Sequence, residues 1–253
     1  MELTRRRFLK VGGLATIALA ISPVLSTLTR LGLPKAAAEA KAAKRWAMAV
    51  KTGVCPNGCK ECIDACHSIH NVPDFGNPKD EVKWIWDVSF EAACPDQEHE
   101  FLKEDLKHLP VVVLCNHCDN PSCVRVCPTK ATFRREDGIV MMDYHRCIGC
   151  RYCMAACPYG SRSFNWRDPR PFIKDIDPDY PTRTRGVVEK CNFCEERLAQ
   201  GLVPACVGAC PGKVLIFGDV EDPESEIRAL LRDNYSIQRK PALGTKPQIY
   251  YIV

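Results

Sequence analysis

The sequence predicts an α+β fold of two modules related by pseudo-symmetry, with short strands and helices and long loop insertions. The first observation is that all 17 cysteines of the 253-residue chain except Cys94 fall into four runs of four. The second is that the inner two runs can pair with each other and the outer two can pair around them. The third is that short alternating or helical patterns, bounded by Gly and Pro, connect the runs.

The inner two runs lie between Cys115 and Cys157, and each ends in Cys-Pro. They consist of Cys115, Cys118, Cys123 and Cys127 before Pro128, and of Cys147, Cys150, Cys153 and Cys157 before Pro158. The second of them has the C-x2-C-x2-C-x3-C-P spacing of bacterial ferredoxins, and the first differs by two extra residues before its third cysteine. Three thiolates on one tight loop can hold three corners of a cubane, and the fourth ligates the other cluster of a two-cluster module.

This spacing predicts a ferredoxin-like central module, residues 111–166, with two [4Fe–4S] clusters held by crossed ligand sets. Set 3 consists of Cys115, Cys118, Cys123 and Cys157, and set 4 consists of Cys147, Cys150, Cys153 and Cys127. The alternatives are zinc sites on the C-x-x-C pairs and disulfides. Two complete runs that end in Cys-Pro are more specific for iron–sulfur clusters.

The outer two runs are less regular. They consist of Cys55, Cys59, Cys62 and Cys66, and of Cys191, Cys194, Cys206 and Cys210. The same crossed rule gives set 1, with Cys55, Cys59, Cys62 and Cys210, and set 2, with Cys191, Cys194, Cys206 and Cys66. The sequence therefore predicts an outer module from residues 45–66 and 186–253. An insertion at 67–110 and a Pro-rich loop at 167–185 separate the parts of the two modules.

Five further side chains invite a ligand interpretation. Cys94 has no C-x-x-C partner, and we expect a buried structural thiol. The alternative is that Cys94 replaces one ligand of the irregular first run. His67, His70, His117 and His145 are expected to form hydrogen bonds or to pack, because the cysteines already complete the sites.

Local patterns between the runs predict the regular elements. Alternating or β-branched segments predict strands at 45–51, 82–88, 111–114, 161–166, 213–217 and 248–253. A hairpin is expected over 131–143, because Asp137-Gly138 suits a tight turn. Helical segments are expected at 98–109, at 195–201 where Gly201 ends the pattern, and at 223–232 with Pro223 in the first turn.

Residues 1–40 resemble a twin-arginine signal peptide. Arg5-Arg6-Arg7 precede an apolar stretch over 11–33, and the small residues at 36–40 offer cleavage sites. An uncleaved membrane anchor is the alternative, although Pro23 and Arg30 weaken it. The twin-arginine route exports folded proteins already loaded with cofactors. It therefore implies a chain on the extracytoplasmic, periplasmic face of the membrane.

The charge distribution gives no indication of nucleic-acid binding. The formal net charge is +4, but residues 1–40 carry six basic and two acidic residues, and the other 29 basic and 29 acidic residues cancel. Four clusters, each with four thiolates, would add roughly −8. The loaded protein is therefore expected to be acidic in effect.

The cysteine framework of residues 45–253 resembles the four-cluster iron–sulfur subunits of the NrfC, PsrB and DmsB type. Residues 59–73, 81–87 and 186–200 resemble the DsrO subfamily, exported subunits of the Dsr (DsrMKJOP) membrane complexes of sulfur and sulfate metabolism. This resemblance implies three partners: an NrfD-type integral membrane subunit that interacts with quinone, a c-type cytochrome and a further iron–sulfur subunit.

The expected function is electron transfer by four [4Fe–4S] clusters in a membrane-bound, quinone-linked respiratory complex of sulfite-reducing metabolism. No catalytic residues are predicted, because sixteen cysteines complete four iron sites and no Ser-His-Asp, Walker or G-x-G-x-x-G pattern is present. The same framework could serve a molybdopterin-dependent terminal reductase. The sequence also leaves open an enzyme with a substrate-binding cluster at the irregular first run, and a structural module stabilised by zinc or disulfides.

Overall fold

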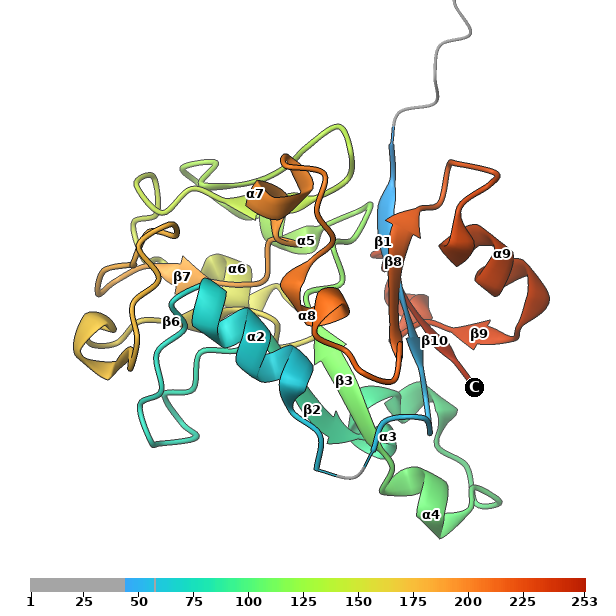
Figure 1. The fold of residues 1–253 in the computed structure, drawn as a ribbon. Helices are drawn as coiled ribbons and strands as arrows, with labels where there is room; N and C mark the ends of the chain where they lie inside the picture. The colour runs from blue at the N-terminus through green and yellow to red at the C-terminus, as the bar shows by residue number, and fades with distance from the viewer. Residues whose placement is uncertain (1–43, 57) are drawn as a thin grey trace, which may run out of the picture. The chain divides into compact units, whose positions relative to one another are not determined.

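The computed structural model describes residues 44–56 and 58–253, and a four-stranded sheet lies at one end of this described part (Figure 1). Its strand order is β8-β1-β10-β9. The strands are β1 (Trp46–Lys51), β8 (Leu215–Asp219), β9 (Ser236–Ile237) and β10 (Ile249–Ile252). The twin-arginine segment expected at 1–40 lies outside the described residues. Within the described part, no helix is both long and apolar enough to cross a membrane.

Strand β1 is buried on both faces, which explains its apolar sequence. It pairs in parallel with β10 and antiparallel with β8, so that Met48 lies opposite both Ile249 and Phe217. Ala47 and Ala49 face a small cluster under helix α9 (Glu226–Asp233), whereas Met48 and Val50 point into the main core. The alternation of β1 therefore joins two apolar layers.

Three further sheets have two strands each. The pairs are β2 (Ile85–Ser89) with β3 (Pro110–Leu114), β4 (Thr132–Arg134) with β5 (Val140–Met142), and β6 (Ser163–Phe164) with β7 (Val188–Glu189). All three pairs are antiparallel. The β4–β5 hairpin turns at Gly138, whose positive φ of 83° suits glycine.

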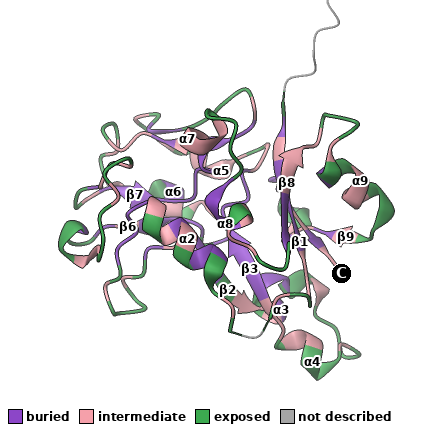
Figure 2. Ribbon diagram, viewed as in Figure 1, coloured by how far each residue is buried: buried purple, intermediate pink, exposed green. Residues whose placement is uncertain are grey.

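Short helices lie within or between the cysteine runs. The longest of them is α2 (Glu61–Ile69), which packs against α8 (Ala205–Gly208). The others are α3 (Phe90–Ala93), α4 (Glu104–Lys107), α5 (Ser122–Arg125), α6 (Tyr152–Ala155) and α7 (Glu195–Leu198). Single 3-10 turns occupy Pro95–Gln97, Arg170–Phe172 and Pro241–Leu243. Figure 2 shows that the buried positions concentrate along β1, β3 and the facing sides of α2 and α8.

The α+β fold class is confirmed, and most expected elements are present with shifted ends. The strand expected at 82–88 begins at Ile85, because Trp84 packs against His70 and Tyr180 instead of pairing. The helix expected at 98–109 is one turn, α4. The helix expected at 223–232 begins at Glu226, where the Ser225 hydroxyl caps it by accepting from Arg228 N. The sequence-based prediction missed the nine-residue helix α2, the one-turn helices α3, α5, α6 and α8, and the two-residue strands β7 and β9.

A buried ion pair connects the Pro-rich loop to the core. Arg183 Nη2 lies 2.6 Å from a Glu189 carboxylate oxygen, and both side chains are at most 1% exposed. Trp84 Nε1 and Asn165 Nδ2 donate to the same carboxylate at 3.0 and 2.6 Å. Arg183 also donates to the carbonyls of His70 and Asn71. The loop expected at 167–185 is thus fixed by a fully buried charge.

We expect Glu189→Ala to lower the free energy of unfolding by about 3–5 kcal/mol, the usual cost of removing one partner of a buried ion pair. The substitution leaves the Arg183 guanidinium without its counter-ion, and Trp84 Nε1 loses its acceptor. Urea denaturation of the purified protein, followed by tryptophan fluorescence, measures the change. Glu104→Ala is the matched control, because Glu104 pairs with Lys107 at the surface and its loss should leave the unfolding midpoint unchanged. Equal midpoints for both variants would contradict the role assigned to Glu189.

Candidate iron–sulfur centres

The four cysteines of set 3 line one cavity of the central module. Cys115 follows β3, Cys118 lies three residues later, Cys123 is on α5, and Cys157 comes from the second run. Burial raises the pKa of the Cys118 thiol to about 12, and the neighbouring set members add to the rise. Four converging thiols provide the donors that a [4Fe–4S] cluster requires, so the residues present fit this cofactor.

The cysteines of set 4 line a second cavity, with Cys127 contributed by the first run and the others by the second. The turn at Gly149 requires glycine: its φ is 68°, and a Cβ there would lie 2.5 Å from the Gly186 carbonyl oxygen. Burial acts to raise the pKa of Cys127, but backbone hydrogen bonds from Thr132, Thr129 and Ala131 outweigh it and lower the pKa. These amides favour the thiolate, which is the form that binds metal.

Helix α2 serves both sets of the outer module. Cys62 and Cys66 lie one helical turn apart, and both are buried. The pKa of Cys62 is raised to about 12, mainly by burial. Cys210, Cys55 and Cys59, the other members of set 1, add to the rise. Burial also raises the pKa of Cys66, followed by Cys191, Cys206 and Cys194, which are the rest of set 2. The two distant runs therefore meet through the packing of α2 on α8.

Some thiols of different sets are neighbours. Burial raises the pKa of Cys191 in set 2, and Cys115 of set 3 adds to the rise. Burial and the other members of set 2 raise the pKa of Cys206, and Cys62 of set 1 adds to that rise. Cys123 of set 3 contributes to the raised pKa of Cys153 in set 4. Set 2 therefore has neighbours in sets 1 and 3, and set 3 has a neighbour in set 4.

Comparison with known proteins agrees with these sites. Residues 107–170 and 177–220 match the model of the 4Fe-4S dicluster domain family. The chain is 40% identical to the Hdr-like menaquinol oxidoreductase iron-sulfur subunit 1 of Archaeoglobus fulgidus, over 98% of this chain and 97% of that protein. It is 38% identical to the menaquinone reductase iron-sulfur cluster-binding subunit of Nitratidesulfovibrio vulgaris, over 82% and 88%. It is 40% identical to the iron-sulfur subunit of a putative dimethyl sulfoxide reductase of Halobacterium salinarum, over 77% and 74%.

The chain belongs to the family of iron–sulfur electron-transfer subunits that contain 4Fe-4S dicluster domains. Its relatives include the NrfC protein of Escherichia coli, at 38% identity over 77% of this chain and 75% of that protein. The family has a ferredoxin-like fold and [4Fe–4S] clusters. The α+β fold and the many cysteines of this subunit match these two properties.

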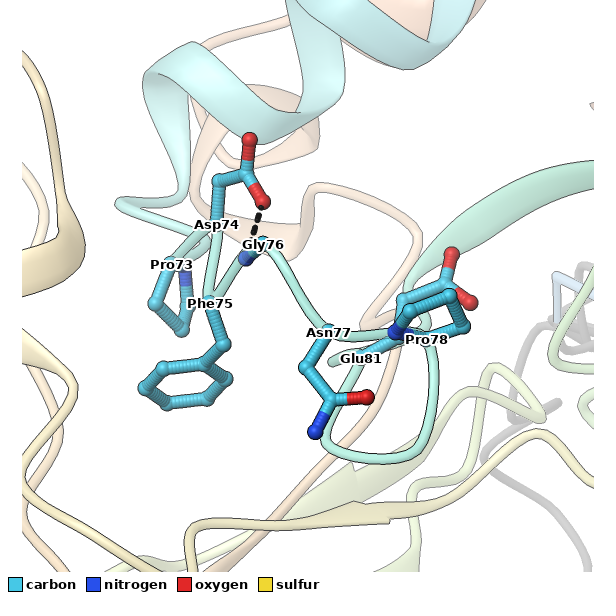
Figure 3. Close-up of a pocket in the computed structure, with 7 residues that line it drawn as sticks. All are labelled: Pro73, Asp74, Phe75, Gly76, Asn77, Pro78 and Glu81. Atoms are coloured by element: carbon cyan, nitrogen blue, oxygen red, sulfur yellow. Dashed lines mark hydrogen bonds between the residues drawn. The ribbon is translucent and has the colours of Figure 1, made fainter.

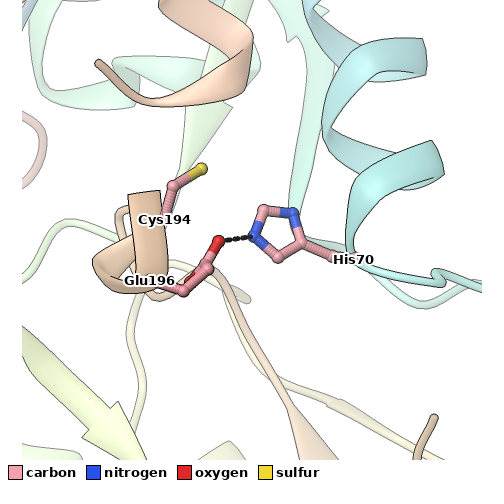
Figure 4. A group of neighbouring side chains, drawn as sticks. All are labelled: His70, Cys194 and Glu196. Atoms are coloured by element: carbon pink, nitrogen blue, oxygen red, sulfur yellow. Dashed lines mark hydrogen bonds and ion pairs between the residues drawn. The ribbon is translucent and has the colours of Figure 1, made fainter. Parts of the chain in front are cut away.

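His70, Cys194 and Glu196 form a cluster of possible metal ligands beside set 2 (Figure 4). His70 Nε2 lies 2.9 Å from Glu196 Oε1, its Nδ1 lies 2.9 Å from the Cys66 carbonyl oxygen, and its ring stacks on Trp84 at 4.5 Å. Cys194 is also a member of the predicted set 2. The hydrogen bonds of His70 to Glu196 and to the Cys66 carbonyl fix the end of α2.

The remaining histidines pack, form hydrogen bonds or lie at the surface. His117 Nδ1 accepts from Val140 N at 3.1 Å, and its ring stacks on Phe193 at 3.7 Å. His67 is half-buried on α2, and burial lowers its pKa. His145 is exposed. The hydrogen bonds and ring stacking expected of the histidines are therefore present at His70 and His117.

A surface hollow lies away from the cysteines, on the loop from Pro73 to Glu81 (Figure 3). Asp74 Oδ1 accepts from Gly76 N at 2.9 Å, and Phe75 packs against Phe172 and Arg167. The hollow's lining residues include no nucleophile paired with a base.

Two buried cations beside the iron–sulfur sites were not predicted from the sequence. Arg162 lines the cavity of set 3 and donates to Cys123 Sγ. Lys190 is 1% exposed and donates to the carbonyls of Val140 and Cys191, next to set 2. Neither residue lies within an apolar run of the sequence, so hydropathy gives no sign that they are buried.

Cys94 lies in the main core, 2% exposed, and the described groups that affect its pKa include no other cysteine. Burial raises the pKa of its thiol to about 11, opposed by Arg239. The structural-thiol prediction therefore agrees with its position.

We expect the Cys94 thiol to resist alkylation, because at pH 8 only about 0.1% of a thiol with a pKa near 11 is ionised. Iodoacetamide should label Cys94 in the denatured protein but not in the folded protein, as mass spectrometry would show. Cys94→Ala should retain the full iron content. A loss of about four irons per chain would show that Cys94 is a ligand.

Proposed function

We propose that this chain carries four [4Fe–4S] clusters as the electron-transfer subunit of a membrane-bound, quinone-linked respiratory complex. The ligands are set 1 (Cys55, Cys59, Cys62, Cys210), set 2 (Cys191, Cys194, Cys206, Cys66), set 3 (Cys115, Cys118, Cys123, Cys157) and set 4 (Cys147, Cys150, Cys153, Cys127). The observation that carries the proposal is that sixteen thiols gather in four groups of four. Each cluster, when bound, takes up and releases one electron.

The chain's own residues hold the clusters, limit their contact with water and set their potentials. Every set offers four thiols, so no iron position is left open for a substrate. The subunit therefore conducts electrons and depends on its partners for catalysis. The proposed modules are the central module at 111–166 and the outer module at 45–66 plus 186–253, with the insertion at 67–110 and the loop at 167–185 between them.

The proposed complex belongs to sulfur and sulfate metabolism, with this chain in the position of DsrO. The similarity to the menaquinol oxidoreductase subunit of A. fulgidus, over nearly the full length of both proteins, supports a quinone-linked assembly. The proposed partners are an NrfD-type membrane subunit, a c-type cytochrome and a further iron–sulfur subunit. The twin-arginine motif at residues 5–7 supports a location on the periplasmic face of the membrane.

The second candidate function is that of the electron-transfer subunit of a molybdopterin-dependent terminal reductase. The similarity to the dimethyl sulfoxide reductase relative of H. salinarum and to a tetrathionate reductase subunit of Salmonella typhimurium favours it. Both candidates use the same cysteine framework, so the partner proteins distinguish them.

We expect Cys153→Ser to damage set 4 and to interrupt electron transfer through the complex. A serine hydroxyl replaces one thiolate of the set. Because the clusters are proposed to act in series, loss of one cluster blocks electron transfer through the subunit. Iron content and quinol-dependent reduction of the complex's acceptor would measure the effect, and immunoblotting of the exported fraction would check export. Cys94→Ser is the matched control, since it makes the same atomic change outside the four sets. Normal turnover by the Cys153→Ser complex after loss of the set 4 cluster would contradict the serial arrangement.

Purification of the native complex from membranes, with this chain as the handle, tests the choice between the two candidates. Covalently bound haem without molybdenum is expected for the quinone-linked complex. Iron above this chain's share, which is about sixteen atoms, would indicate the further iron–sulfur subunit. Molybdenum without haem would overturn the DsrO-like proposal and favour the terminal reductase.

A further inference from the structure

Arg162 lies between the two cysteine sets of the central module. Its side chain is only 5% exposed. Nη2 donates to Cys123 Sγ of set 3 at 3.1 Å and to Thr132 Oγ1 at 2.6 Å. Burial raises the pKa of the Cys153 thiol in set 4, and Arg162, which faces that thiol, opposes the rise. The Arg162 guanidinium therefore contacts Cys123 of set 3 and faces Cys153 of set 4.

This buried charge has no carboxylate partner among residues 44–56 and 58–253. Of the other buried arginines, Arg183 pairs with Glu189 at 2.6 Å and Arg45 pairs with Asp119 at 2.7 Å, whereas Arg239 donates to the Ala93 carbonyl. Arg162 differs from all three because its acceptors include a thiol of a predicted cluster site. Because an uncompensated buried charge is costly and arginine remains protonated, the thiolates of sets 3 and 4 would compensate this charge.

The outer module has an apolar residue at the corresponding place. In both modules six residues follow the last Cys-Pro, and the sixth is a phenylalanine. The position compared with Arg162 lies two residues before that phenylalanine. The segments read C-P-Y-G-S-R-S-F from Cys157 and C-P-G-K-V-L-I-F from Cys210, so Leu215 corresponds to Arg162. Leu215 is 2% exposed in the main core. In the described part of the chain, Arg162 provides the only hydrogen bond from an arginine or lysine side chain to a cysteine sulfur of the four sets. Lys190, beside set 2, donates to the backbone carbonyl of Cys191.

We propose that Arg162 raises the reduction potentials of the two central clusters. Reduction adds negative charge to a cluster, and a nearby cation that donates to a ligand sulfur stabilises the more negative state. This inference rests on the proposed ligand sets. It adds that sets 3 and 4 share one buried cation, whereas Lys190 lies beside set 2 and donates to a backbone carbonyl.

Arg162 also affects the direction in which electrons are favoured to move. The boundary between the two modules falls between set 2 and set 3, where Cys191 neighbours Cys115. By raising the potentials of sets 3 and 4, Arg162 shifts the equilibrium of electron transfer toward the central module. Each tenfold change in the reduction equilibrium corresponds to about 59 mV for a one-electron couple.

Potentiometric titration monitored by electron paramagnetic resonance tests the proposal on the full-length exported protein. Arg162→Gln removes the charge but keeps an N–H donor, and two of the four midpoint potentials should fall while the other two stay in place. Arg162→Lys keeps the charge, and its potentials should stay close to those of the wild type. The Cys153→Ser protein identifies which potential belongs to set 4. Unchanged potentials in an iron-replete Arg162→Gln protein, or an equal fall of all four, would overturn the proposal.

A second pair of variants tests the charge without altering the arginine. Thr132→Asp places a carboxylate where the hydroxyl now accepts from Arg162, so it should lower the same two potentials. Thr132→Asn accepts the same hydrogen bond without charge and should leave them unchanged. If Arg162→Gln and Thr132→Asp both lost iron while Thr132→Asn kept it, the charge would be needed to assemble the sites and the proposal would be wrong. Fewer than about sixteen irons in the wild type would instead refute the four-cluster function on which it rests.

Discussion

The fold of the outer module depends on bringing together two cysteine runs that lie at opposite ends of the described chain. Cys66 and Cys191 belong to the same group of thiols although 125 positions separate them. Helix α2 packs on α8, and β1, which leads into the first run, pairs with β8, which follows the last. The entropy of closing so long a loop is offset by the apolar layers on both faces of β1. The same helix and strand pairings therefore form both the four-stranded sheet and the cysteine sites of the outer module.

Burial sets the chemistry at these sites. The thiols of Cys62 and Cys118 have raised pKa values because they are desolvated and surrounded by other thiols. Metal binding requires thiolates, so cluster assembly must release protons from these groups. Cations that lie close to the thiols lower the cost of gathering thiolates. Arg162 and Lys190 occupy such positions, which explains why these charges are tolerated in the interior.

Cysteine spacing led to the proposed ligand sets, and local patterns predicted β1, the hairpin at Gly138 and the one-turn helix α7. Helix α2 was missed because its cysteines were treated as ligands on a loop, although Cys62, Ile63 and Cys66 occupy one buried helical face. The ion pair of Arg183 with Glu189 was not predictable, since a Pro-rich segment gives no sign of what it packs against. Arg162 could have been found by aligning the two Cys-Pro segments, where an arginine in one replaces Leu215 of the other.

The burial of the cysteines distinguishes one set from the other three. All four members of set 2 are buried, whereas three of the four in each of sets 1, 3 and 4 are only half-buried. Exposed apolar side chains lie beside two of the half-buried sets: Val54 precedes set 1, and Ile148 and Tyr152 lie within the run of set 4. Cysteines near the surface shorten the distance to a donor or acceptor, so sets 1 and 4 are suited to face partner proteins. The Arg162 side chain is itself buried, so solvent and salt screen its charge little.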